Sequence, residues 1–291
     1  MYLNPGESQF PIKQSCSSSF YLHETVLEQG SGDENEDTLS TINDLHIVCD
    51  GATSITDAAC YPKSGGRQAA ALTAEVLSVN QGSLQDMVSR ANRAIQRAMH
   101  DSSVELNHRE SLWSTSFAAL RFDGDSIEWA QSGDCMILLI HKNGRCELLT
   151  EQPGHDIGTL QKWKEIGPGE TRTIHQALAA EIAEVRKGMN REYGVLNGEP
   201  EALDFVNYGV KNVGSVTDIL LFSDGLWLPS ELPEKPLDIS AMGQLYKQVG
   251  LTGIKDRIRL MQRKDPRCCR YPRFKMYDDI SGIALKQRER S

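Results

Sequence analysis

The chain has 291 residues, of which 40 are acidic and 31 basic, so its formal net charge is −9. This charge argues against a general nucleic-acid-binding protein, because binding to a polyphosphate requires an excess of positive charge. Hydrophobic residues make up 39% of the chain and charged residues 24%, as in ordinary soluble globular proteins.

Neither membrane insertion nor secretion is expected from the sequence. No apolar run approaches the roughly 18 residues that a membrane span requires. The N-terminus has neither the basic region nor the apolar region of a signal peptide. The seven cysteines include no Cys-x-x-Cys pair, and their odd number suits reduced thiols. We therefore expect a cytoplasmic protein that binds neither nucleic acid nor membranes.

The first residues differ in character from the rest of the chain. Residues 1–18 are polar and rich in serine, proline and glycine, which predicts a flexible N-terminal lead-in. Residues 19–291 contain no segment typical of a linker, so we expect one domain there. Residues 22–44 hold seven acids and no lysine or arginine. This run is compatible either with a solvated surface or with a site that holds cations.

Acids recur at the ends of strand-like segments. The apolar run at 45–49 ends on Asp50-Gly51, where glycine allows the backbone to turn sharply. Alone, this ending favours a hairpin turn. However, a second apolar run ends on Asp224-Gly225, a strand-like segment precedes Asp134, and Asp278 directly precedes the apolar alternation near the C-terminus. Several distant acids, each beside a strand, predict one metal site.

The remaining elements predict an α+β protein. Helices are expected at 66–100, where apolar residues recur at helical spacing, and Ser83 with Asp86 resembles a capping box. Residues 113–150 predict four strands in an antiparallel meander, with Asn143-Gly144 as its clearest hairpin turn. A mobile excursion beside a site is expected at 151–175, which is rich in proline and glycine. The later elements are expected as a helix at 175–192, a strand at 218–223, helices at 240–262 and a strand at 280–286.

Because helical segments flank strands that come in antiparallel runs, the simplest arrangement is a β-sandwich. Two antiparallel sheets would pack on each other, with helices on both outer faces, as a four-layer αββα structure.

Metal-assisted hydrolysis explains the distribution of acids best. Mg²⁺ and Mn²⁺ take oxygen ligands. Two such ions can share a water, lower its pKa and direct an in-line attack on phosphorus. The sequence lacks the spacing of a zinc site, a Gly-x-x-x-x-Gly-Lys phosphate loop and a Gly-x-Ser-x-Gly nucleophile turn.

Taken in order, these motifs resemble the metal-dependent protein phosphatases of the phosphatase 2C family, and they are most similar to the stand-alone bacterial members. The resemblance covers about residues 20–286 and is carried by Asn35-Glu36-Asp37, Asp50-Gly51, Gly65-Gly66, Ser114-Thr115, Gly133-Asp134, Ser223-Asp224-Gly225 and Asp278-Asp279-Ile280-Ser281. Each motif is common, but their order is specific.

The resemblance implies a centre with two Mn²⁺ or Mg²⁺ ions, and a weaker third, at one end of the sandwich. It implies that the catalytic metal ligands are Asp50, Asp224 and Asp278, that the Gly51 carbonyl adds another ligand, that Glu36 holds a metal-bound water, that Asp37 is a neighbouring acid, and that Asp134 helps to hold the third ion. The excursion at 151–175 corresponds to the mobile flap of the family.

The chain departs from the family at two positions. The family usually has a phosphate-binding arginine four residues before the acid matched by Glu36, and here that residue is Gly32. Many eukaryotic members have a histidine where this chain has Ala52, although bacterial relatives often lack it. Residues 255–275 hold nine basic residues against two acids. Such a run is usually a solvated surface, but it offers replacements for the arginine. We hypothesise that the substrate phosphate is bound by one of Arg267, Arg270 and Arg273, or alternatively by Arg67.

These observations predict a cytoplasmic serine/threonine protein phosphatase of bacterial signalling that hydrolyses phosphomonoesters by attack of a metal-bridging water. Its partner would be a phosphorylated protein, opposite a serine/threonine kinase. Two alternatives stay open: an inactive or weakly active binding module with the same fold, and a phosphatase of small phosphorylated molecules.

Overall fold

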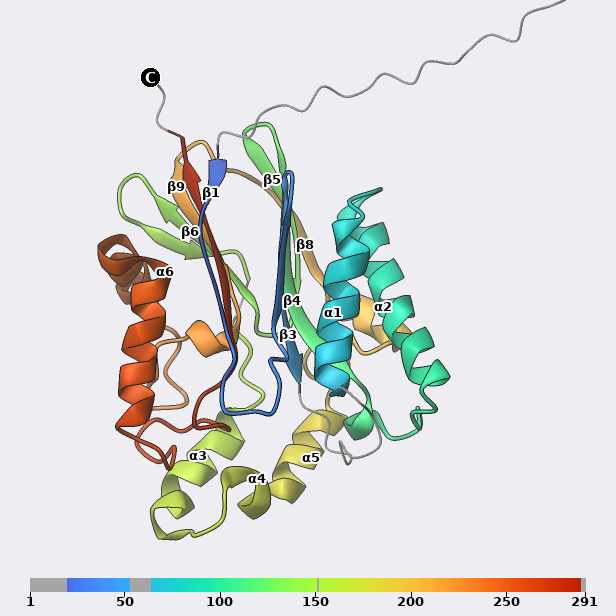
Figure 1. Cartoon of the computed structure of the whole chain (residues 1–291), viewed down its shortest axis with the longest axis vertical. Helices are drawn as coiled ribbons and strands as arrows, with labels where there is room; N and C mark the ends of the chain where they lie inside the picture. Colours follow the sequence, from blue (N-terminus) through green and yellow to red (C-terminus); the bar gives the residue numbers. More distant parts are fainter. Residues whose placement is uncertain (1–19, 53–63, 151, 289–291) are drawn as a thin grey trace, which may run out of the picture.

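The computed structural model describes residues 20–52, 64–150 and 152–288. The expected lead-in at 1–18 lies outside the described residues. In the described part of the chain, ten strands form two sheets that pack face to face, with all neighbouring strands antiparallel (Figure 1). The first sheet contains, in spatial order, β1 (Phe20–Glu28), β10 (Ile280–Gln287), β9 (Val216–Phe222), β6 (Met136–His141) and β7 (Cys146–Leu148). The second contains β2 (Thr38–Ile42), β3 (Leu45–Ala52), β4 (Ser114–Asp123), β5 (Ser126–Ser132) and β8 (Asn207–Asn212).

Helices cover the outer face of each sheet. The antiparallel pair α1 (Gly65–Ser78) and α2 (Leu84–Asp101) lies against the second sheet, and α6 (Ile239–Arg263) lies against the first (Figure 1). The buried apolar side chains accordingly form three layers, one between the sheets and one between each sheet and its helices. The predicted four-layer αββα sandwich is thus confirmed.

The helical pattern in the sequence explains α2. Its N-cap Ser83 accepts a hydrogen bond from the backbone N–H of Asp86, as the capping motif predicts. Its apolar positions, beginning with Leu84 and Met87, are buried against α1 and the sheet. Among the described residues, none of the helices is long and apolar enough to cross a membrane.

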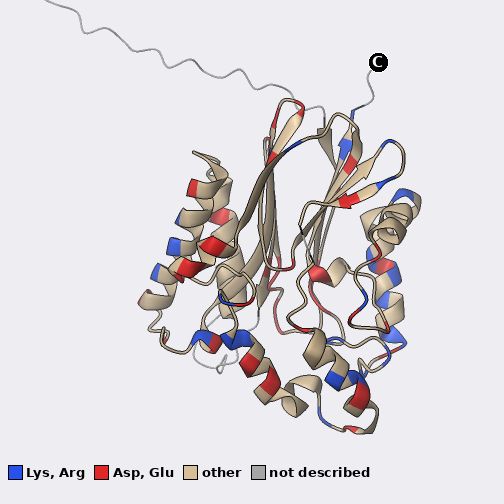
Figure 2. Cartoon of the chain, turned by 180° about the vertical axis from the view of Figure 1, so that it is seen from behind, with Lys and Arg blue, Asp and Glu red and all other residues tan. Residues whose placement is uncertain are grey.

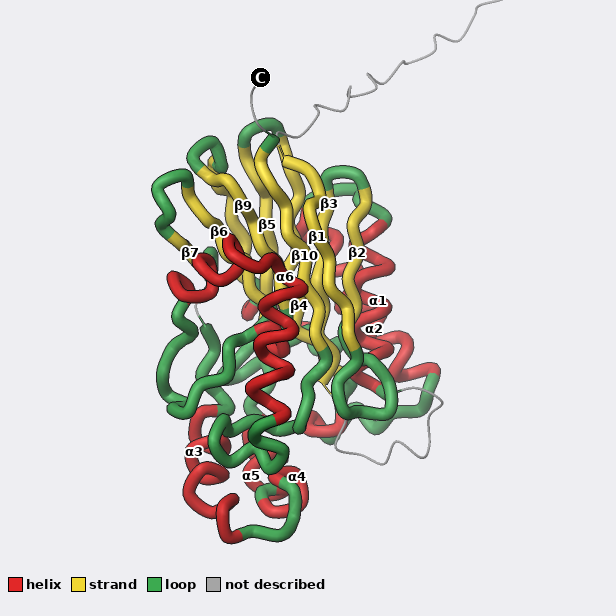
Figure 3. Tube along the Cα trace, turned by 60° about the vertical axis from the view of Figure 1, so that its left-hand side comes forward, coloured by secondary structure: helices red, strands yellow, loops and turns green. Residues whose placement is uncertain are grey.

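Residues 152–188 form a separate helical segment, which we call the flap, at one end of the sandwich (Figure 3). It contains α3 (Ile157–Ile166), a 3₁₀ turn at Gly167–Gly169, α4 (Ile174–Ala177) and α5 (Ala179–Lys187). The sequence analysis predicted a mobile excursion at 151–175, and it did not predict the helix α3 within it. Trp163, Ile174 and Leu178 form a small apolar cluster that orders this segment.

Two further strand predictions need correction. The four strands expected as one meander divide between the sheets, because β4 and β5 belong to the second sheet and β6 and β7 to the first. The chain crosses between the sheets at Gly133, whose φ of +78° suits a turn that residues other than glycine rarely adopt. In addition, the edge strand β8 was not predicted.

Candidate metal centre

The strand ends that carry the predicted acids meet at the end of the sandwich where the flap lies. Asp50 lies near the end of β3 in the second sheet, and Asp224 begins a 3₁₀ turn directly after β9 in the first sheet. Asp278 lies two residues before the start of β10, and Asp134 lies in the connection between β5 and β6. Acidic positions accordingly gather in the loops where the two sheets end (Figure 2).

The charges of these acids act on one another. Desolvation raises the pKa of Asp50 well above its ordinary value, and the nearby carboxylates of Asp37, Asp224, Asp134 and Asp278 raise it further. The pKa of Asp224 is raised in the same way, first by desolvation and then by Asp278 and Asp134. The structure therefore brings together acids that are 241 positions apart, from Asp37 to Asp278. Such a cluster of like charges favours either protonation or a bound cation.

Asp37 is the most enclosed of these acids. Burial raises its pKa to about 7, although a hydrogen bond from Ser223 acts in the opposite direction. The Ser223 hydroxyl donates to Asp37 Oδ2 over 2.7 Å, and it accepts a hydrogen bond from the Ser281 backbone N–H over 3.0 Å. Ser223 thus connects the Asp37 carboxylate to the end of β9 and the start of β10. The other oxygen, Asp37 Oδ1, is buried and has no hydrogen-bond partner among the described residues.

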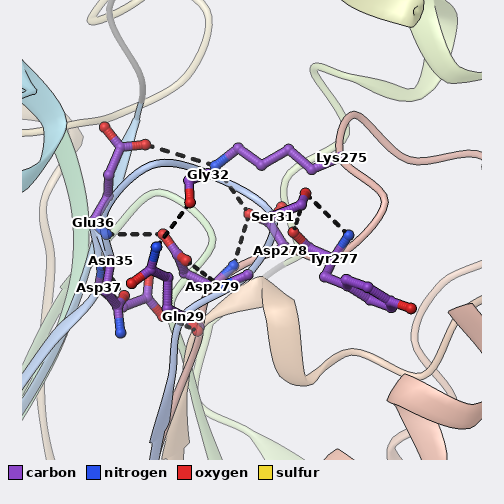
Figure 4. Close-up of polar contacts among 12 residues, drawn as sticks. Gln29, Ser31, Gly32, Asn35, Glu36, Asp37, Lys275, Tyr277, Asp278 and Asp279 are labelled. Carbon is purple, nitrogen blue, oxygen red and sulfur yellow. Dashed lines mark hydrogen bonds and ion pairs between the residues drawn. The ribbon is translucent and has the colours of Figure 1, made fainter. Parts of the chain in front are cut away.

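Asp279, which the sequence analysis did not single out as a site residue, holds the acidic loop in place (Figure 4). Its Oδ1 accepts a hydrogen bond from Gly30 N–H over 2.7 Å, and its Oδ2 accepts one from Glu36 N–H over 2.8 Å. In the same loop as Gly30, the hydroxyl and the backbone N–H of Ser31 both donate hydrogen bonds to the carbonyl oxygen of Tyr277. Because Asp279 is adjacent to Asp278, this arrangement fixes the loop that carries Glu36 relative to Asp278.

Close backbone contacts explain two of the glycines beside the acids. A Cβ at Gly51 would lie 2.3 Å from the carbonyl oxygen of Gly66, at the start of α1. A Cβ at Gly225 would lie 1.8 Å from the carbonyl oxygen of Asp279. Both distances are too short for a side chain, so glycine lets the strand ends and α1 converge at this point.

Lys275 is a site residue that the sequence analysis missed. Its Nζ lies 3.1 Å from Asp278 Oδ1 and 3.6 Å from Glu36 Oε2, so that it links the two predicted site acids (Figure 4). Burial alone would lower the pKa of Lys275, but Asp278, Glu36 and Asp50 raise it above the ordinary value. The ammonium group is therefore charged and offsets part of the negative charge of the cluster. The sequence offered one signal for Lys275, because this residue belongs to the basic run at 255–275 from which the candidate phosphate ligands were chosen.

The three arginines of the run at 255–275 that were suggested as phosphate ligands form contacts with protein groups in this structure. Arg267 donates to the carbonyl oxygen of Gly167 over 2.9 Å, and Arg270 forms an exposed ion pair with Glu231. Arg273 forms an ion pair with Asp265 and donates to four backbone carbonyl oxygens.

Arg67 is the arginine of the hypothesis that lies nearest to the acidic loop. Its Nε lies 3.3 Å from Glu34, and it donates to the carbonyl oxygen of Asn35. It therefore braces the loop that carries Glu36. The position of Lys275, between two of the site acids, differs from that of all four arginines.

Two further arginines support the site. Arg259 donates to the carbonyl oxygen of Asp278 over 2.8 Å and lies over the ring of Tyr277. Arg186 lies in α5 of the flap, where burial lowers the pKa of its guanidinium and the nearby Tyr193 and Glu36 act in the opposite direction. Neither was singled out from the sequence, because their roles depend on long-range contacts.

The donor set suits hard divalent cations, because it consists of carboxylates with a backbone carbonyl nearby. The buried Asp37 Oδ1, which lacks a partner among the described residues, is consistent with this fit. As the side chains stand, no group of three or more His, Cys, Asp or Glu residues in the described ranges is arranged to hold an ion.

Comparison with solved structures identifies the fold. The structure of the Mycobacterium tuberculosis serine/threonine phosphatase PstP/Ppp matches 93% of this chain and 99% of its own length, with a TM-score of 0.57 and 14% identity. The PstP catalytic domain in complex with two manganese ions gives a TM-score of 0.56 at 15% identity, over 92% of this chain and 98% of its own. PppA of Pseudomonas aeruginosa, described as a key regulatory component of T6SS, gives 0.57 at 15% identity, over 94% of this chain and 99% of its own.

No family model matches the sequence, and no curated protein matches it. The chain nevertheless has the fold of the bacterial serine/threonine phosphatases, and the resemblance to the phosphatase 2C family is confirmed at the level of the fold.

Proposed function

We propose that this chain is a metal-dependent phosphatase that removes phosphate from phosphoserine or phosphothreonine in proteins. The observation that carries the proposal is the convergence of acids from both sheets at one end of a fold shared with serine/threonine phosphatases. One of those phosphatases was solved with two manganese ions, which supports the same cofactor here.

The acids can be assigned roles on this basis. Asp50, Asp224 and Asp278 would hold two Mn²⁺ or Mg²⁺ ions, with the Gly51 carbonyl as a further ligand. Glu36 would hold a metal-bound water, Asp37 would be a neighbouring acid, and Asp134 would help to hold a weaker third ion. When bound, such ions act as Lewis acids on a phosphoryl oxygen and make water a stronger nucleophile.

Lys275 would take the role of the absent arginine. Its ammonium lies among the acids and its side chain is partly exposed, so a substrate phosphate could approach it. A lysine offers a compact charge to one or more phosphate oxygens, without the two parallel hydrogen bonds that arginine provides. Arg259 and Asp279 would hold Asp278 and Glu36 in position through hydrogen bonds with the backbone of these two residues.

The test is hydrolysis of a phosphothreonine peptide in the presence of Mn²⁺. The same assay is performed with excess chelator and with the Asp224→Ala variant. We expect turnover by the wild-type protein, no turnover under either control condition, and recovery when Mn²⁺ is returned to the chelated sample. Activity that survives complete removal of divalent ions would exclude the proposal.

One observation favours a second candidate, a non-catalytic binding module. Lys275 already offsets part of the acidic charge without a metal ion. A purified protein that binds Mn²⁺ by calorimetry, but hydrolyses neither phosphopeptides nor small phosphate esters, would support this alternative.

A further inference from the structure

A cavity of about 390 Å³ opens beside the acids. Asp134, Asp224 and Asp278 line it, so the cavity and the proposed metal centre share side chains. Most of its other lining residues come from the first residues of the flap, the segment after β9 and the loop before β10, and Gln262 of α6 adds to them. The flap lies at one end of the sandwich (Figure 3).

Away from the acids, the cavity walls are largely apolar. The lining includes Ile157 and Leu160 of α3, Trp227, Leu228 and Leu232 of the segment after β9, and Phe274 of the loop before β10. Leu232 retains 46% of its surface exposed, so a molecule that enters the cavity can contact it. The volume of the cavity lies near the lower end of the range for small-ligand sites. A cavity of this size can hold one or two amino-acid side chains of a bound peptide.

The two ends of the cavity therefore differ in chemistry. A phosphate bound at the acidic end would place the group to which it is esterified toward the apolar walls. A phosphorylated sugar would leave its hydroxyl groups against leucine, tryptophan and phenylalanine, at the cost of their hydrogen bonds with water. A large apolar side chain would instead gain from leaving water at this point.

We infer that this cavity binds a large apolar side chain that neighbours the phosphorylated residue of a polypeptide substrate. The inference rests on the proposed function and narrows its substrate class. The charged residues of the lining are mostly acidic, because Asp156, Glu234 and Asp238 add to the three acids shared with the metal centre, against Lys235 and Arg273. An acidic neighbour of the phosphorylated residue should consequently be disfavoured by charge.

The test compares phosphothreonine peptides that differ only next to the phosphorylated residue, with leucine, phenylalanine, serine or aspartate before or after it. Para-nitrophenyl phosphate serves as a small substrate. We expect kcat/KM to be about 10-fold higher or more for the leucine or phenylalanine peptides than for serine in at least one position, as one well-buried side chain provides. Aspartate should give the lowest value.

Variants of the cavity show whether the preference arises there. Leu232→Ser changes a partly exposed lining residue, so the fold should tolerate it. Val210→Ser is the matched control, because Val210 is 75% exposed on β8 and does not line the cavity. We expect Leu232→Ser to reduce the preference for the apolar peptide through KM, with hydrolysis of para-nitrophenyl phosphate unchanged, and Val210→Ser to change neither.

The outcomes separate the two proposals. Equal kcat/KM for all peptides, or a preference that Leu232→Ser leaves unchanged, would overturn the inference while phosphatase activity stands. A higher kcat/KM for sugar phosphates than for every peptide would also overturn it. Loss of activity on all substrates would contradict the proposed function itself, and with it the inference that rests on it.

Discussion

Replacing Lys275 by methionine removes its charge and keeps much of its length. The ammonium lies 3.1 Å from Asp278 Oδ1 and 3.6 Å from Glu36 Oε2. At such separations two unit charges attract by about 5 kcal/mol at an effective dielectric constant near 20, but desolvation of the ammonium offsets much of this. The side chain is 23% exposed. We therefore expect a net contribution of about 2 kcal/mol, between the values typical of exposed and buried ion pairs.

The expected effect changes with the metal ion. Without divalent ions, Lys275→Met should lower the free energy of unfolding by about 2 kcal/mol, and hence Tm by roughly 4–8 °C. With Mn²⁺ the loss should shrink or reverse, because the ammonium no longer repels the cation. The Kd for Mn²⁺ should fall about 10-fold, which corresponds to about 1.4 kcal/mol. The KM for a phosphothreonine peptide should rise about 10-fold or more, as loss of a charged hydrogen bond implies.

Thermal unfolding with chelator and with Mn²⁺, together with calorimetric titration of Mn²⁺, measures these effects. Lys142→Met is the control, because it removes the same charge from the exposed β6–β7 turn, where Lys142 donates to the carbonyl oxygen of Gly214. Lys275→Arg should preserve most of the metal-free stability. An equal loss of stability with and without Mn²⁺, with Kd and KM unchanged, would refute the assignment and leave Lys275 a structural role only.

Two further predictions concern the acids and their surroundings. The pKa of Asp37 is about 7 instead of 3.8, so the folded state retains a proton that the unfolded state loses, and metal-free stability should fall as pH rises from about 4 through 7. The difference of about three pH units corresponds to about 4 kcal/mol, and Asp37→Asn should remove most of this part of the slope in urea unfolding at pH 5 and 8. A slope identical to that of the wild type would contradict the assignment. Gly225→Ala should lower the unfolding free energy by about 3 kcal/mol or more, because its Cβ would lie 1.8 Å from the carbonyl oxygen of Asp279. Gly158→Ala in α3, where a Cβ meets nothing within 4 Å, should leave Tm nearly unchanged, and a similar loss in both variants would argue against a steric cause.

The sandwich could be predicted because its signals are local. Alternating and continuous apolar runs marked the buried strands, and the capping serine of α2 marked where that helix begins. The sheet to which each strand belongs was not predictable in the same way. The segments β5 and β6 follow one another closely, and only the packing of distant segments places them in different sheets.

The elements that were missed carry weak local signals. The strand β8 has mostly polar or exposed residues, since an edge strand needs few buried side chains. Helix α3 is short and contains Gly158, so proline and glycine dominated the pattern around it. Its stability depends on burial of Trp163, whose indole N–H donates to the carbonyl oxygen of Cys268, 105 positions later.

The predicted acids of the site could be found because each follows or precedes a recognisable strand. The positive charge could not, because the choice among the basic residues at 255–275 depends on how this segment folds. Arg273 is held by Asp265, and this contact shapes the loop that leads to Lys275 and Asp278. A prediction based on residue type favoured arginine, whereas the fold places a lysine among the acids.

The backbone at position 32, where the phosphatase 2C family usually has an arginine, does not require glycine. A Cβ at Gly32 would meet only the carbonyl oxygen of Glu34, at 3.5 Å, which is an ordinary contact. The positive charge comes instead from Lys275, on the same short segment as Asp278. A phosphate that draws Lys275 toward itself would therefore remove a counter-charge from a proposed metal ligand. Since linkage between two ligands is reciprocal, phosphate and Mn²⁺ should each strengthen the binding of the other through this one ammonium group.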